Sequence, residues 1–364
     1  MALIEVIIPT YKRSNELAKC LFSLEKSIKN TSLRHRSKVG ISVRNNTTEN
    51  FIHYRNLIEK YSTIFKKLGV AFFNYHITGF NIGGINNILG GFFSSKSEYV
   101  WFLPDDDIVR FDAFSIIIFA IEKYNPCFLS GGCLQKSRIK KYDSNEDGKD
   151  DGESNSILEV LYDNTKISTF LLNKGPVQAQ EYIYSTKCLN KFLDDDSNLD
   201  LINEMHPGMF AIFCLKSPFP FVRLKRSIGI FRDGDPNSEW RHLWWKFALI
   251  DWPILSKKLW LKGWLNKKEM IISTRAFISS LSTLSGRPDI LLGLNWKSKI
   301  NPFVLLKNYP YDYLVSLIKS PINCLKAIKN KLKIMREANN VNKKKNSYFQ
   351  DTRNLITLFR KNFF

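Results

Sequence analysis

The sequence has few cysteines and no long apolar runs. Its six cysteines, among 364 residues, are scattered and form no Cys-x-x-Cys pair, so neither a zinc site nor a disulfide framework is predicted. No uninterrupted apolar stretch approaches the roughly 18 residues that a membrane-spanning helix needs. No signal peptide precedes the first apolar run, which begins close to the amino terminus. These absences favour a globular protein of the cytoplasm, where thiols stay reduced.

Acidic residues become scarce in the last third of the chain. Beyond residue 240 there are 24 Lys and Arg against 6 Asp and Glu, whereas the first 240 residues hold 30 against 28. Seven of the eight tryptophans lie at or beyond this boundary. The break predicts an amino-terminal domain over residues 1–240 and a basic, tryptophan-rich, mainly helical region over residues 241–364.

The first part alternates short apolar runs with helical periodicity. Strands are expected over 3–8, 39–43, 70–75, 98–103 and 127–133, with helices over 15–29, 51–67, 84–94 and 111–124. We expect Pro9 to end the first strand and Ser14 to cap the helix that follows. This alternation predicts an α/β fold with a mostly parallel, twisted sheet that helices cover on both faces.

Three consecutive carboxylates, Asp105 to Asp107, follow an aromatic and β-branched run in the segment EYVWFLPDDD. Such a run predicts a buried strand. Clustered carboxylates at its end are costly unless a cation sits between them, and oxygen ligands of this kind suit a hard divalent cation. The alternative is a solvated acidic turn, because most charge runs are exposed. Polar residues also follow the first and second expected strands, and carboxyl ends of parallel strands meet at one edge. The sequence therefore predicts a ligand site at this edge.

Four segments together resemble a known family. They are VIIPTYKRSNEL (6–17), SVRNNTT (42–48), NIGGINN (81–87) and EYVWFLPDDD (98–107). Their order and spacing are similar to the nucleotide-binding half of the family 2 glycosyltransferases, which have the Rossmann-like GT-A fold. The resemblance is close over residues 3–135 and loose over 175–235. It implies transfer of a sugar from a nucleoside diphosphate sugar, a UDP-sugar first among the donors, with inversion and with Mg²⁺ or Mn²⁺.

The resemblance also implies roles for single residues. The positions that it places at the donor are Pro9, Thr10, Tyr11, Arg13, Asn45, Asn81, Gly83, Asp105 and Asp106. It places Asp107, together with Asp105, at the metal. Asn45 departs from the family, which usually has an Asp that holds the base, and an amide brings a donor as well as an acceptor. For Asn81 and Gly83, a turn at the start of a helix is the alternative interpretation.

An inverting displacement needs a general base on the acceptor side. The resemblance points to the segment NLDLINEMHP (198–207), in which Glu204 is the first candidate, His206 the second and Asp200 the third. His206 is equally well explained as an ordinary residue at a helix start. We expect residues 1–135 to form the donor-binding half, which binds the nucleotide sugar, and residues 157–240 to form the acceptor-binding half. Residues 141–156 are expected to form a flexible acidic loop. That loop has the early spacing of a calcium loop but lacks the Glu at its twelfth position.

The last third of the chain interleaves aromatic and basic residues, as interfacial segments do. We expect it to hold the protein on an anionic membrane surface, at the cytoplasmic face of the inner membrane. That place suits a glycan or lipid-linked glycan acceptor in the synthesis of a bacterial surface polysaccharide, such as O-antigen or capsule. Packing between helices is the alternative for its tryptophans, and an oligomer is compatible with the sequence.

Two other functions compete with the enzymatic one. A catalytically silent scaffold of the same fold would also explain Asn45 and the ambiguous base. A nucleic-acid binder would explain the basic, aromatic tail, but three clustered aspartates oppose a polyanion. No nucleic-acid partner is therefore expected.

Overall fold

The protein is described by a computed structural model. It covers residues 1–47, 51–135, 158–161, 181–193, 220–231, 246–275, 303, 305, 307, 309 and 313–316. The chain divides into two compact units. One comprises residues 1–241 with 251–277, and the other comprises residues 242–250 with 278–364. The proposed donor-binding and acceptor-binding halves of the first 240 residues stay predictions.

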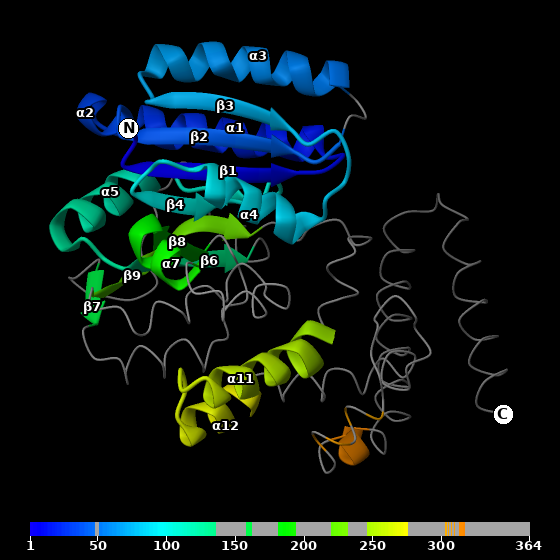
Figure 1. Ribbon diagram of the computed structural model, residues 1–364. Coiled ribbons are helices and arrows are strands. Elements are labelled where there is room, and N and C mark those ends of the chain that lie inside the picture. Colours follow the sequence, from blue (N-terminus) through cyan, green and yellow to red (C-terminus); the bar gives the residue numbers. More distant parts are fainter. Residues whose placement is uncertain are drawn as a thin grey trace, which may run out of the picture. The chain divides into compact units, whose positions relative to one another are not determined.

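Nine strands of the described residues form one mixed sheet. Its first half is parallel, in the order β3-β2-β1-β4 (Figure 1). The bounds are β1 Ile4–Thr10, β2 Val39–Asn45, β3 Phe72–Ile77 and β4 Tyr99–Phe102. Each of these strands overlaps an expected one, and the expected α/β fold class is confirmed.

The second half of the sheet mixes both strand directions. Strand β8 (Tyr182–Ser185) runs antiparallel between β4 and β6 (Phe128–Gln135). Strand β9 (Phe221–Phe231) runs parallel to β6. Two short strands, β5 (Ile108–Val109) and β7 (Leu158–Leu161), pair antiparallel with β9. Strand β9 thus pairs with three other strands, β5, β6 and β7. It was not among the strands expected from the sequence.

Helices cover both faces of the sheet. Among the residues that the structure describes up to position 231, the helices are α1 Ser14–Lys29, α2 Leu33–Arg36, α3 Phe51–Leu68, α4 Gly84–Ser94, α5 Ala113–Tyr124 and α7 Thr186–Leu193. Helices α1, α3 and α5 share one core with the side chains of Ile4, Val6 and Ile8 of β1. Helix α4 lies on the opposite face, in front of the sheet in Figure 1, close to the side chain of Ile7. Successive side chains of β1 thus point to opposite faces of the sheet and pack against the helices on each face.

Two local expectations at the start of the chain are wrong. Pro9 does not end β1, which continues to Thr10 and pairs Pro9 with Arg44 of β2. The ladder between β1 and β4 stops at Ile7. Pro9 therefore lacks an N–H at a position where β4 no longer pairs with β1, and the sheet tolerates it. Ser14 does not cap α1, because Arg13 occupies the N-cap position and no side chain caps the helix.

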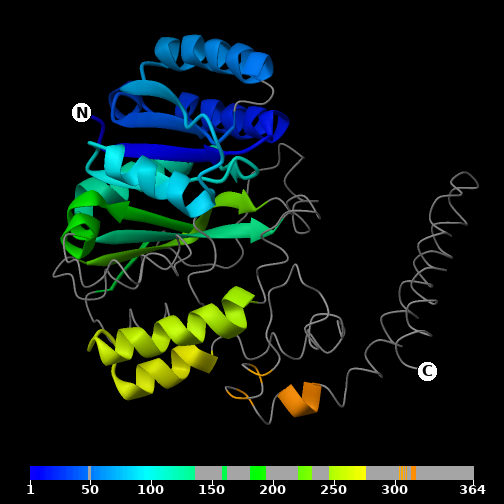
Figure 2. The ribbon, with the colours of Figure 1, turned by 45° about the vertical axis from the view of Figure 1, so that its right-hand side comes forward.

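Part of the basic region forms a helical pair. A π-helix, η6 (Phe247–Asp251), precedes α11 (Trp252–Leu261), which packs against α12 (Lys267–Arg275), the two yellow helices of Figure 2. Trp252 is fully buried, and its indole N–H donates to the carbonyl of Ser273 at 2.9 Å. For this tryptophan, packing between helices is the correct interpretation. None of the described helices is both long enough and apolar enough to cross a membrane.

Candidate active site

The carboxyl ends of β1, β2 and β4 meet at one edge of the sheet. Thr10 and Asn45 form the last pair of the β1–β2 ladder. Strand β4 lies on the other side of β1 and ends three residues before Asp105. The parallel order places these side chains on neighbouring loops, as expected from the sequence.

The turn after β1 is tied to the aspartate cluster by ion pairs. The guanidinium of Arg13 lies 2.9 Å from Oδ1 of Asp105 and 2.8 Å from Oδ2 of Asp106. Asp105 is fully buried and Asp107 is 1% exposed, whereas Asp106 is partly exposed. The three acids therefore do not form a solvated turn, and the buried pair fits the interpretation that they serve a ligand.

Asp105 is strongly perturbed by its surroundings. Burial raises the pKa of its carboxyl to about 7, because the charged form loses its hydration. The guanidinium of Arg13 opposes this rise, and the negative charge of Asp106 adds to it. A carboxyl in this state favours the approach of a positive charge, since a cation beside it lowers its pKa.

Tyr54 of α3 is a site residue that the sequence did not reveal. Its hydroxyl accepts a hydrogen bond from the backbone N–H of Arg13 at 2.8 Å and lies 3.2 Å from Oγ1 of Thr10. The ring is fully buried in the main core. On an amphipathic helix such a tyrosine is indistinguishable from an ordinary core residue, and its partners lie more than forty positions away.

Asn45 is fully buried with both ends of its amide engaged. Its Nδ2 donates to the hydroxyl of Tyr75 at 2.9 Å, and its Oδ1 accepts from the backbone N–H of Thr47 at 3.2 Å. Each contact uses one of the two functions that distinguish an amide from a carboxylate. Tyr75, on β3, is thus a second neighbour that sequence reasoning missed.

The Asn-x-Gly turn before α4 is held by its own polar contacts. Oδ1 of Asn81 accepts from the backbone N–H of Gly83 at 2.9 Å and from Nδ2 of Asn46 at 2.7 Å. Gly83 has a φ of 84°, in the left-handed region that favours glycine. Oδ1 of Asn46 accepts in turn from the backbone N–H of Ile82 at 2.9 Å. The turn interpretation therefore accounts for both Asn81 and Gly83, while their contact with a donor stays a prediction.

The remaining predicted site residues are either partly exposed, part of a strand, or outside the described residues. Tyr11 is 38% exposed beside Thr10, with the ammonium of Lys12 5.2 Å from its ring centre. Pro9 lies within β1. The three candidates for the general base, Asp200, Glu204 and His206, lie outside the described residues, as does the acidic loop over 141–156.

The acidic residues fit a cation that takes only part of its coordination from the protein. Among the described residues, no three His, Cys, Asp or Glu side chains gather closely enough to hold an ion alone. Asp105 and Asp107 offer buried carboxylate oxygens, the donor type that Mg²⁺ and Mn²⁺ prefer. Mg²⁺ usually keeps several waters and shares its sites with phosphate groups. Two carboxylates are therefore a suitable protein contribution.

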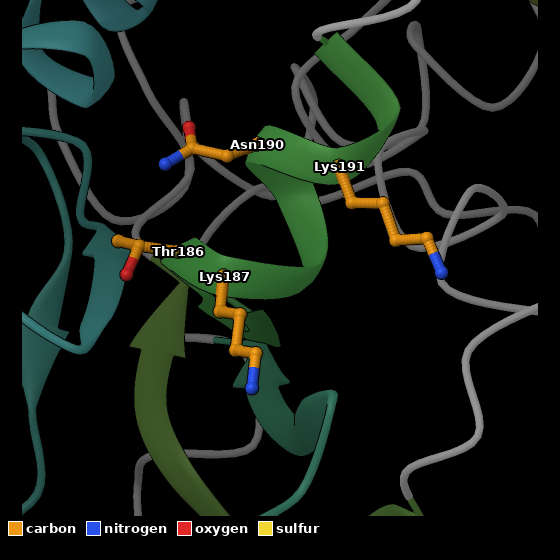
Figure 3. Close-up of a pocket in the computed structure, with 4 residues that line it drawn as sticks. All are labelled: Thr186, Lys187, Asn190 and Lys191. Atoms are coloured by element: carbon orange, nitrogen blue, oxygen red, sulfur yellow. The ribbon is translucent and has the colours of Figure 1, made fainter.

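A shallow hollow on α7 is separate from this edge. It is lined by Thr186, Lys187, Asn190 and Lys191, with both lysine side chains on the same side of the helix (Figure 3). The hydroxyl of Thr186 donates to the carbonyl of Glu98, just before β4 begins. The hollow thus lies at the opposite end of β4 from the aspartates.

Comparison with known proteins identifies the architecture. No protein-family model matches the chain, and no curated protein sequence matches it. The crystal structure of S. aureus TarS 1-349 matches with a TM-score of 0.53 at 12% identity, over 89% of each chain. The fold is GT-A-like. A crystal structure of S. aureus TarS also matches with a TM-score of 0.53 at 12% identity, over 89% of this chain and 54% of that one. Mannosyltransferase PcManGT from Pyrobaculum calidifontis, in complex with GDP-Man and Mn²⁺, matches at 11% identity with a TM-score of 0.47, over 87% and 86% of the two chains.

Proposed function

We propose that this protein is a glycosyltransferase that moves a sugar from a nucleoside diphosphate sugar to a hydroxyl of a glycan or lipid-linked glycan. The observation that carries the proposal is the convergence of Thr10, Arg13, Asn45 and the aspartates at the carboxyl edge of a GT-A-like sheet. Open α/β sheets bind their ligands at this edge. The four sequence segments that resemble family 2 contribute the same residues, so family 2 is the proposed family.

The polar groups at the edge suit the parts of such a donor. Thr10, Asn45 and the half-buried Tyr75 offer neutral hydrogen-bonding groups for a nucleoside. Arg13 supplies a fixed positive charge beside the acids, suited to a diphosphate. Asp105 and Asp107 would hold Mg²⁺ or Mn²⁺. When bound, that ion would stabilise negative charge on the departing nucleotide.

Inversion and the identity of the base are part of the proposal. A single in-line displacement needs a group that removes the proton of the acceptor hydroxyl. Glu204 is the proposed base, with His206 and Asp200 as the other candidates. The proposed donor is a UDP-sugar, and the proposed pathway is the synthesis of a bacterial surface polysaccharide.

Attachment to an anionic membrane surface is proposed for the basic carboxyl-terminal region. In its described part, Ile254, Leu261 and Ile271 are exposed on α11 and α12. Exposed lysines lie on the same two helices, at positions 257, 267 and 268. Exposed apolar side chains among lysines are typical of helices that lie in the headgroup region of a bilayer.

A screen of nucleotide sugars tests the activity. Purified protein is incubated with UDP-, GDP-, CDP- and dTDP-sugars, with Mn²⁺ or with EDTA, and nucleotide release is measured. We expect slow, Mn²⁺-dependent release from one nucleotide class and at least a hundredfold loss in Asp107→Asn, because an amide is a weaker ligand than a carboxylate. Glu98→Gln is the matched control, since Glu98 is an exposed carboxylate before β4. The absence of metal-dependent binding and turnover would favour the silent scaffold.

A further inference from the structure

The turn between β1 and α1 contains a strained residue. Lys12 has a φ of 56°, in the left-handed region that non-glycine residues seldom adopt. Such a conformation is strained and persists only where its surroundings hold it. Arg13 follows directly, at the N-cap position of α1. The strain is thus stored next to the side chain that pairs with the aspartates.

One hydroxyl group holds both ends of this turn. The backbone N–H of Arg13 donates to the hydroxyl of Tyr54, and Oγ1 of Thr10 lies 3.2 Å from the same oxygen. Tyr54 belongs to α3, and its ring is fully buried among the core side chains. The oxygen is therefore a fixed point to which a strained turn is attached. Its desolvation also raises the pKa of Tyr54, so the hydroxyl keeps its proton at neutral pH.

We infer that Tyr54 is a positioning residue of the donor site, whose hydroxyl fixes the turn over residues 10–13 and thereby aims Arg13 at Asp105 and Asp106. The inference rests on the proposed function for its consequence in donor binding. Its structural part, the link from the hydroxyl of Tyr54 to the ion pairs of Arg13, does not depend on that function.

Tyr54→Phe separates the hydroxyl from the ring. The substitution keeps the buried ring and removes only the oxygen that binds the turn. Tyr61→Phe is the matched control, because Tyr61 is also a core residue of α3 and its hydroxyl donates to the carbonyl of Ala18 at 3.4 Å, away from the site. Thermal unfolding of both variants shows whether either loses its fold.

The first experiment needs no ligand. Side-chain ¹⁵N–¹H spectra of the metal-free protein report the guanidinium of Arg13, whose signals are assigned by their loss in Arg13→Lys. In the parent protein and in Tyr61→Phe we expect slowly rotating N–H groups, as two ion pairs impose. In Tyr54→Phe we expect these signals to average or to exchange at least fivefold faster. Unchanged Arg13 signals in Tyr54→Phe would overturn the inference.

The second experiment measures the consequence for binding. Titration calorimetry with Mn²⁺ compares UDP, GDP, CDP and dTDP, and the tightest nucleotide becomes the probe. We expect Tyr54→Phe to weaken binding about tenfold, as the loss of one partly buried hydrogen bond would. In an Arg13→Ala background the same substitution should change binding less than twofold, because Tyr54 acts through Arg13. Additive losses would overturn the inference. If the parent protein binds none of the nucleotides, the proposed function fails, and the Arg13 spectra alone decide the role of Tyr54.

Discussion

Nη2 of Arg13 and Oδ1 of Asp105 lie 2.9 Å apart, which joins the turn after β1 to the loop after β4. Asp105 is fully buried, whereas 35% of the Arg13 side chain is exposed. A partly solvated guanidinium offsets only part of the cost of burying the carboxylate. The ion pair therefore holds the two loops together and still leaves the site favourable for further positive charge.

The stability of the metal-free protein should depend on Asp105 in a pH-dependent way. The pKa of this carboxyl is raised from 3.8 to about 7 in the folded state. Between these values the folded protein keeps a proton that the unfolded chain has lost, so stability falls as pH rises from about 4 to 7. Asp105→Asn should remove this loss and stabilise the protein at pH 8 by up to about 4 kcal/mol.

Urea unfolding in EDTA, at pH 5 and at pH 8, measures this difference. The gain from Asp105→Asn should shrink towards pH 5, where the carboxyl is largely protonated in the folded state. The same variant should bind Mn²⁺ and nucleotide more weakly, because the site trades stability for function. A variant that is less stable than the parent protein at pH 8 would contradict the argument.

Close packing of α4 against the sheet predicts opposite effects for two glycines. A Cβ on Gly91 would lie 2.6 Å from the side chain of Ile7 and 2.8 Å from that of Arg44. Gly91→Ala should therefore destabilise the protein by about 1–3 kcal/mol. A Cβ on Gly84 meets nothing within 4 Å, so Gly84→Ala should be neutral or stabilise by up to about 1 kcal/mol. Thermal unfolding compares the two, and equal effects would show that the backbone of α4 yields to the added methyl group.

Much of the first half of the fold could be predicted, because its signals are local. Helix α4 has the expected bounds, 84–94, and α3 differs from expectation by one residue. The expectation for Pro9 was wrong because a proline ends a strand only where a neighbouring strand would need its N–H. The ladder with β4 stops before Pro9, and a sequence alone does not show how far a ladder extends. Strand β9 was missed because its apolar residues are interrupted by Arg223, Lys225, Arg226, Ser227 and Gly229.

The residues of the candidate site also divide into those that local sequence signals revealed and those that they did not. Residues at or just after strand ends, such as Thr10 and Asp105, could be found because strand ends define one edge of a parallel sheet. Tyr54 and Tyr75 could not be found, because each acts through a hydroxyl that reaches the edge from a neighbouring element. Such contacts depend on side-chain direction in three dimensions, which hydrophobic periodicity does not encode.

The amide of Asn45 should influence the choice of base. In Asn45→Asp, the hydroxyl of Tyr75 and the backbone N–H of Thr47 can both donate to the new carboxylate, so we expect the fold to tolerate it. A carboxylate accepts a base N–H more strongly than an amide does. The preference for UDP, whose base carries an N–H at N3, over CDP should therefore rise about tenfold. Calorimetry with both nucleotides measures the ratio, and an unchanged ratio would place the base away from Asn45.

Membrane attachment predicts a dependence on the lysines of α11 and α12. Replacing Lys257, Lys267 and Lys268 together by Glu should weaken binding to phosphatidylglycerol vesicles at least tenfold, since each lysine near an anionic surface contributes about 1 kcal/mol. Vesicle sedimentation in low and high salt measures the effect.

A matched variant controls for net charge. Lys60, Lys66 and Lys67 are exposed on α3, and their replacement by Glu changes the charge by the same amount. This control should bind vesicles nearly as well as the parent protein. Equal losses of vesicle binding in both variants would mean that the net charge of the protein determines binding, and that α11 and α12 do not form a specific membrane-binding surface.

The location of a bound cation tests the central claim most directly. Crystals grown with Mn²⁺ and UDP are measured at a wavelength where manganese scatters anomalously. The account predicts one strong anomalous peak beside the carboxylates of Asp105 and Asp107, with the diphosphate on its far side. A peak elsewhere, or nucleotide bound away from the carboxyl ends of β1 and β4, would contradict it.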